Sequence, residues 1–234
     1  MHILPTRTAR SAANMATDLM LLESYPKPDT PRLRHYGWSG PAWSFGLSQT
    51  FNETHERILA LPCELVRRPT GGGLVDHLDD WTYALVVPPG ARGYRDGPAA
   101  LYRLVHEQIA AAFAAQGLAS VLHAVKSTDG LHAVCFEQPE QYDLTLPGGA
   151  KIAGAAQKRT RDGLLVQGSI TRRLPVSINW IQFADDFAVG LSQLFGTSPA
   201  PAPGPAWDEQ RLARETARFA SEAWNKKRRH VLDV

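Results

Sequence analysis

The sequence predicts an α+β fold in which a mixed β-sheet has helices packed on it. Helical apolar periodicity occurs near both ends of the 234-residue chain, and short strand candidates fill its middle. Strands and helices do not alternate regularly along the chain, which favours a mixed sheet. At this length one domain can bury a sizeable core, and we expect residues 1–234 to form a single domain.

The N-terminal part is predicted to contain one helix and four strands. Met15, Leu19 and Leu22 recur at helical spacing within residues 11–23, with charged residues between them. Aromatic and β-branched runs bounded by proline or glycine predict strands at 33–38, 42–47, 63–68 and 81–87.

The C-terminal part is predicted to be β-rich between helices. Residues 98–116 carry a continuous apolar stripe with Pro98 suited to the first turn and Gly117 to the end. Further helices are expected at about 183–195 and 207–224, joined by an extended proline-rich connector. Strands are expected at 120–124, 133–136, 142–146, 151–156 and 164–170.

Charge and composition exclude several classes of protein. The chain is 44% hydrophobic and 21% charged with a formal charge of +2, so bulk charge predicts neither a nucleic-acid nor a membrane partner. No apolar run approaches the roughly 18 residues of a membrane span, and the N-terminus lacks the apolar core of a secretory signal. Two cysteines, Cys63 and Cys135, are too few for a disulfide framework, so we expect free thiols and a cytoplasmic protein.

A glycine-rich loop follows the third predicted strand. Arg67, Arg68 and Thr70 precede three glycines at 71–73, so a ligand could approach the backbone N–H groups closely. The loop lacks the lysine of a phosphate-binding P-loop and the spacing of the dinucleotide fingerprint. From these residues alone, an anion site and a tight turn between strands are both open.

One lysine and one cysteine carry alternative interpretations. Lys151 is followed by small residues at 153–156 that would leave room for a ligand, although an exposed strand lysine is the common alternative. Cys135 could be a buried strand cysteine. A thiol beside a lysine ammonium instead has a larger thiolate fraction, as a cysteine nucleophile requires.

Longer motifs surround these residues. Residues 67–77 read Arg-Arg-Pro-Thr-Gly-Gly-Gly-Leu-Val-Asp-His. Two further patterns, Arg-x-Tyr-x-Trp with Gly-x-x-Gln and Lys-Ile-x-Gly-x-Ala-Gln-x-Arg, are formed by Arg34, Tyr36, Trp38, Gly46, Gln49, Lys151, Ile152, Gly154, Ala156, Gln157 and Arg159. From about residue 13 to 225 the chain thereby resembles the lipoate–protein ligases and octanoyltransferases of the biotin/lipoate protein ligase family.

The resemblance implies a catalytic fold similar to that of biotin ligases and class II aminoacyl-tRNA synthetases, with a slot for a medium-length acyl chain. It implies that residues 1–234 are the catalytic domain and that the accessory C-terminal domain of many ligases is absent. It makes Lys151 and Cys135 catalytic. It places at the substrate or acyl adenylate the residues Arg67, Arg68, Thr70, Gly71, Gly72, Gly73, Leu74, Val75, His77, Asp143, Gly154, Gly168 and Ser169.

Two details leave roles open. His77 could act in catalysis or serve as a structural hydrogen-bonding residue. Gln167 stands where the family often has histidine, and an amide cannot act as an acid or base near neutral pH.

The octanoyltransferases of the ligase-like branch carry Cys-Phe-x-x-Pro and then a Tyr-acidic pair, which resembles Cys135, Phe136, Pro139, Tyr142 and Asp143.

The resemblance implies that the protein lipoylates a lysine of lipoyl carrier domains, in 2-oxoacid dehydrogenases or the glycine cleavage H protein. The favoured hypothesis is an octanoyltransferase that takes the acyl group from octanoyl acyl carrier protein through a Cys135 thioester and needs no cofactor. The alternative is a ligase that activates free lipoate with ATP and Mg²⁺ and, at this length, uses a separate accessory chain. A non-catalytic paralogue that binds lipoyl domains is the third hypothesis.

Overall fold

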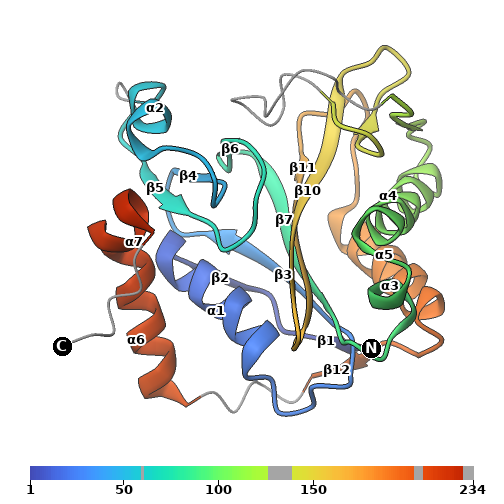
Figure 1. Ribbon diagram of the computed structural model, residues 1–234. Helices are drawn as coiled ribbons and strands as arrows, with labels where there is room; N and C mark the ends of the chain where they lie inside the picture. The colour runs from blue at the N-terminus through green and yellow to red at the C-terminus, as the bar shows by residue number, and fades with distance from the viewer. Residues whose placement is uncertain (59–60, 126–138, 203–207, 229–234) are drawn as a thin grey trace.

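A computed structural model describes residues 1–58, 61–125, 139–202 and 208–228. Within them, a nine-stranded sheet runs through the centre of the molecule (Figure 1). Its strands, in spatial order, are β12 (Ala200–Pro201), β1 (His2–Ile3), β3 (Arg32–Trp38), β7 (Asp80–Val87), β11 (Gly163–Thr171), β10 (Lys151–Thr160), β9 (Leu144–Thr145) and β8 (Val121–Leu122), with β2 (Arg7–Ala9) also on β3. β1 pairs in parallel with β3 and β12, as β2 does with β3, whereas the other pairs are antiparallel. The predicted mixed sheet is confirmed.

A smaller sheet lies beside one end of the large one. It contains β5 (Glu64–Arg67), β4 (Ala42–Phe45) and β6 (Val75–Asp76) in that order. β4 pairs in parallel with β5 and antiparallel with β6. The glycine-rich loop joins β5 to β6, so this small sheet holds both ends of the loop.

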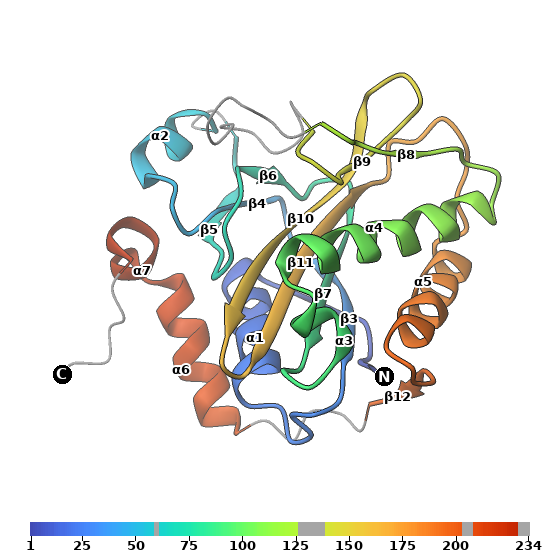
Figure 2. The ribbon, with the colours of Figure 1, turned by 45° about the vertical axis from the view of Figure 1, so that its right-hand side comes forward.

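Helices cover both faces of the large sheet (Figures 1 and 2). α4 (Pro98–Ala114), α5 (Trp180–Leu194) and the short α3 (Arg92–Arg95) lie on one face, where Phe113, Phe183 and Phe187 pack with Trp81 of β7 in the main core. α1 (Ser11–Glu23) and α6 (Glu209–Ala220) lie on the other face and bury a second apolar cluster. Two helical layers thus enclose the sheet, as the predicted apolar faces require.

The observed helix boundaries can be compared with the predicted ones. The helix predicted at 11–23 has those bounds, and α4 ends two residues before the predicted 116. The single helix predicted at 207–224 is wrong, because the helix breaks at Ser221 into α6 and α7 (Glu222–Lys227). The Ser221 Oγ accepts a hydrogen bond from the Trp224 N–H at 3.1 Å, as an N-cap of the new helix does.

Some observed elements were not predicted, and one predicted strand cannot be compared with the structure. α2 (Phe51–Glu56), α3 and the two- or three-residue strands β1, β2, β6 and β12 were not predicted, because each is too short to show a periodicity. The strand predicted at 133–136 lies outside the described residues. None of the helices in the described ranges combines the length and the apolar character needed to cross a bilayer.

Burial of a histidine on α4 makes stability depend on pH. His106 is fully buried, and its Nδ1 donates to the Tyr102 carbonyl at 2.9 Å. Burial lowers the pKa of His106 below its ordinary value of 6.5. As the pH falls below about 6.5, the unfolded chain therefore takes up this proton before the folded one does, and the free energy of unfolding decreases.

We predict that this loss is at most about 1.4 kcal/mol per pH unit and is reduced in His106→Leu. Denaturant unfolding between about pH 7.5 and pH 5 measures it. His55→Gln, which changes an exposed histidine on α2, should keep the wild-type pH dependence. An unchanged slope in His106→Leu would contradict the assignment.

Candidate active site

The glycine loop is held in shape by Arg68. Its Nη2 donates to the carbonyls of Gly71 at 2.9 Å and Gly73 at 2.7 Å, and its Nη1 donates to the Ser44 Oγ at 2.8 Å. Gly72 has a φ of +82°, a left-handed conformation that favours glycine. The guanidinium group therefore fixes the curvature of the loop from inside.

The loop also lies directly against the end of β4. A Cβ on Gly46 would come within 1.9 Å of the Gly72 carbonyl oxygen, so only glycine permits this approach. The Leu47 N–H donates to the Thr70 carbonyl at 2.8 Å. The Gly46 N–H donates to the Gln49 side chain at 2.9 Å, which explains the Gly-x-x-Gln motif as a support for the loop.

Arg67 and Arg68 have different hydrogen-bond partners. Its Nη1 donates to the carbonyls of Leu47 at 2.9 Å and Gln49 at 2.7 Å, and its Nη2 donates to the Asn225 carbonyl at 2.7 Å. The Asn225 side chain in turn accepts from the Arg67 N–H at 2.7 Å. Its guanidinium donors bind backbone carbonyls and tie α7 to the loop, and Arg67 is not among the residues that line the cavity described below. The contact of Arg67 with substrate stays a prediction.

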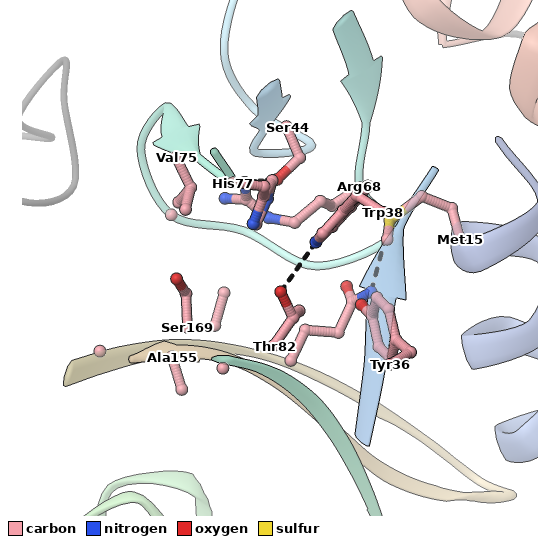
Figure 3. A pocket seen from close by; sticks show the side chains of 15 residues that line it. Met15, Tyr36, Trp38, Ser44, Arg68, Val75, His77, Thr82, Ala155 and Ser169 are labelled. Atoms are coloured by element: carbon pink, nitrogen blue, oxygen red, sulfur yellow. Dashed lines mark hydrogen bonds between the residues drawn. The ribbon is translucent and has the colours of Figure 1, made fainter. Parts of the chain in front are cut away.

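A cavity lies between the glycine loop and the large sheet (Figure 3). The space not filled by atoms is about 420 Å³, part of which is open to solvent. The predicted site residues that line it are Arg68, Gly72, Val75, His77, Gly154, Gly168 and Ser169. The sequence analysis assigned no substrate contact to the lining residues Met15, Tyr36, Trp38, Ser44, Thr82, Ala155, Ala156 and Gln167.

The predicted loop residues Thr70, Gly71, Gly73 and Leu74 do not line this cavity. Leu74 is buried and packs in a small apolar cluster with Phe45 and Ile58. Gly71 and Gly73 contribute the carbonyls that Arg68 binds. These residues shape the loop from behind the surface that faces the cavity.

His77 forms one wall of the cavity and has both ring nitrogens occupied. Nε2 lies 2.6 Å from the Ser44 Oγ, and Nδ1 lies 2.7 Å from a carboxylate oxygen of Asp80. The ring stacks on Trp38 with the centroids 4.1 Å apart. The Ser–His–Asp order is that of serine hydrolases, but the Ser44 oxygen also accepts a charged hydrogen bond from Arg68, which engages its lone-pair density. We therefore interpret the array as a rigid hydrogen-bonded wall.

Gln167 connects the glycine loop to α1. Its Oε1 accepts from the Thr70 hydroxyl at 2.7 Å, and its Nε2 donates to Asp18 at 2.8 Å. Asp18 is fully buried and pairs with Arg34 at 2.5 Å, while Tyr36 donates to its other oxygen at 2.8 Å. Burial raises the pKa of Asp18 despite the nearby guanidinium. An amide offers a donor and an acceptor without titrating, so Gln167 performs this bridging role without an imidazole.

Lys151 is buried in an ion pair at the start of β10. Its Nζ lies 2.7 Å from Asp143 Oδ2, and the two side chains are 2% and 0% exposed. The Tyr102 hydroxyl donates to Asp143 Oδ1, and the Glu140 N–H donates to Oδ2 at 2.6 Å. Tyr102 also accepts from the Ala155 N–H at 2.9 Å, which ties α4 to β10. No pattern in the sequence marks Tyr102 as a site residue, because it lies within the apolar and polar alternation of an amphipathic helix.

Gly154 separates the lysine from the cavity. It lines the cavity, and a Cβ there would lie 2.7 Å from Lys151 Cε, 2.9 Å from Nζ and 3.1 Å from Asp143 Oδ1. The ammonium thus occupies the space that any other side chain at position 154 would fill. Lys151 itself is not among the residues that line the cavity, but it lines a neighbouring groove with Asp76 and Asp79.

A cysteine nucleophile and a metal ion are two further groups that such a site could use. Cys135 lies outside the described residues, so its role stays a prediction. Among the residues that the structure does describe, no group of three or more His, Cys, Asp or Glu side chains is arranged to hold a metal ion.

Solved structures share this fold over nearly the whole chain. A lipoate-protein ligase A bound with ATP superposes with a TM-score of 0.79 and 17% identity, covering 96% of this chain and 98% of that one. A bi-partite lipoate protein ligase from Thermoplasma acidophilum gives a TM-score of 0.73 and 17% identity, covering 99% and 98%. Because the identity is this low, the likeness establishes the fold alone.

Sequence comparisons identify the family. Octanoyltransferase LipM of Oceanobacillus iheyensis is 36% identical over 188 residues, which are 79% of this chain and 67% of that protein. Octanoyltransferase LipM of Symbiobacterium thermophilum is 28% identical over 276 residues, with 96% and 97% covered. The family model for the lipoyl protein ligase A/B catalytic domain matches residues 10–178. The chain therefore belongs to the lipoyl protein ligase A/B catalytic domain family.

Proposed function

We propose that the protein is an octanoyltransferase that attaches an octanoyl group to the lysine of lipoyl carrier domains. The observation that carries the proposal is the Lys151 ammonium, held by Asp143 beside Gly154 at the margin of a cavity whose lining combines small and apolar side chains with several polar ones. Relatives named octanoyltransferase LipM support the choice of transfer over ligation. The bi-partite ligase described with its E2 lipoyl domain supports a lipoyl domain as acceptor.

In this proposal the cavity receives the acyl chain. Gly72, Ala155 and Ala156 leave a narrow space between the loop and the sheet, and Met15 and Val75 add apolar contacts. Such a space suits an unbranched chain, since each buried methylene is removed from water. The carbonyl lies at the Gly154 end, where the Lys151 Nζ donates to the oxyanion that develops during attack.

The reaction proceeds in two balanced steps. The Cys135 thiolate attacks the thioester carbonyl of octanoyl acyl carrier protein, a new thioester forms on Cys135, and the carrier thiolate leaves and takes a proton. The neutral amine of the acceptor lysine then attacks this thioester. An amide forms, the Cys135 thiolate leaves, and the amine proton passes to solvent. Neither step consumes a nucleotide.

We predict that incubation with octanoyl acyl carrier protein and no ATP gives an octanoyl adduct that hydroxylamine removes. Intact-mass spectrometry measures it. Cys135→Ser should abolish the thioester adduct, whereas Cys63→Ser, at a half-buried free cysteine, should retain it. Lys151→Ala should lower the rate of octanoyl transfer by about 10²- to 10³-fold, because it removes the oxyanion donor. Absence of the adduct together with ATP-dependent lipoyl transfer would instead establish a ligase.

A second prediction moves the ammonium without removing it. In Gly154→Ala the new Cβ displaces the flexible end of Lys151, so we expect a folded protein whose kcat/KM for octanoyl transfer falls at least about tenfold. Gly148→Ala is the matched control. Gly148 lies in the turn between β9 and β10, and a Cβ there would meet nothing within 4 Å. Steady-state kinetics and thermal unfolding test both variants. Full activity in Gly154→Ala would contradict the position of the ammonium in the mechanism.

A further inference from the structure

The cavity has two chemically different ends. In the β10–β11 register, Gly154 pairs with Ser169, Ala155 with Gly168, and Ala156 with Gln167. Gly154 is the residue in contact with the lysine, so the pairs lead step by step away from the reacting end. Figure 3 shows Ser169 and Val75 at one side of the cavity and Met15 at the other.

Met15 closes the far end. It lies on the buried face of α1 with an exposed fraction of 1%, and its side chain lines the cavity. Its Sδ accepts a hydrogen bond from the Gln167 Nε2 at 3.4 Å. A chain that enters from the Gly154 end and follows the strands therefore meets the Met15 thioether last.

Buried hydrogen bonds hold this end wall in place. The Gln167 Nε2 also binds Asp18, and its Oε1 binds Thr70 of the glycine loop. Asp18 is itself anchored by Arg34. A longer acyl chain that pushed Gln167 aside would leave several buried polar groups without partners, which is costly. Within the described residues, Met15 makes one side-chain hydrogen bond, to Gln167, and otherwise packs in an apolar cluster, so its flexible thioether can adapt to a chain end.

We propose that Met15 sets the greatest acyl-chain length that the enzyme accepts. The proposal rests on the octanoyl transfer proposed above and assigns its length specificity to one side chain. Met15→Ala removes Cγ, Sδ and Cε, which opens room for about two more methylenes. At about fourfold per buried methylene, the ratio of kcat/KM for decanoyl over octanoyl carrier protein should rise about sixteenfold.

The experiment compares hexanoyl, octanoyl, decanoyl and dodecanoyl acyl carrier protein as donors with the full chain. Met15→Phe, which enlarges the end wall, should shift the preference the other way, from octanoyl towards hexanoyl. Met20→Ala is the matched control, because Met20 is equally buried on the same helix and does not line the cavity. It should leave the ratios between chain lengths unchanged. If Met15→Ala does not fold, the direction of change in Met15→Phe decides.

The outcomes separate the two proposals. Opposite shifts in the two Met15 variants, with unchanged ratios in Met20→Ala, support the assignment. Wild-type octanoyl transfer combined with unchanged ratios in both Met15 variants overturns it and leaves the proposed function standing. A wild-type chain that transfers none of the four acyl groups overturns the proposed function and this inference with it.

Discussion

The ion pair between Lys151 and Asp143 is the contact on which the candidate site depends. Both side chains are almost completely buried, and burying two charges costs more free energy than their attraction returns unless other hydrogen bonds complete the group. Asp143 receives those bonds from the Tyr102 hydroxyl and the Glu140 N–H. The β9–β10 register also shifts between Lys151 and Ala153, which is a local irregularity at the start of β10, where the lysine lies. The fold thus holds an ammonium at one fixed position next to Gly154.

The opposite side of the cavity depends on a second buried network. Arg34, Asp18, Gln167 and Thr70 form a chain of hydrogen bonds from β3 through α1 and β11 to the glycine loop. The loop itself is shaped by Arg68 and rests on Gly46 without any intervening side chain. The cavity is consequently a space between two rigid parts, the loop and the large sheet. Each part is held by buried hydrogen bonds whose loss would cost free energy.

The sequence predicted what depends on local pattern. The helix at 11–23 follows from apolar periodicity, and the loop at 71–73 follows from three consecutive glycines, so both were found at the right place. The pairing of Lys151 with Asp143 was not predicted, because the resemblance only placed both residues at the site and the seven residues between them carry no pattern that brings the two side chains together. Cys135 remains a prediction, because the described residues do not include it.

The features of the site that were not predicted depend on contacts between segments that are distant in the sequence. Arg67 and Arg68 are adjacent, and only the register of β5 decides that the second faces the cavity and the first meets Asn225. Tyr102 reaches Asp143 from α4, and no periodicity in that helix marks it. Met15 looked like an ordinary core residue, and its position at the cavity end appears only when α1 is packed on β11.

The most direct test is a crystal structure of the chain with an octanoyl carrier analogue in which a methylene replaces the thioester sulfur. We expect the ketone oxygen within about 2.7–3.2 Å of the Lys151 Nζ and the terminal methyl group against Met15. An analogue bound in reverse, or in another groove with its ketone far from Lys151, would contradict the role of Lys151 as the oxyanion donor.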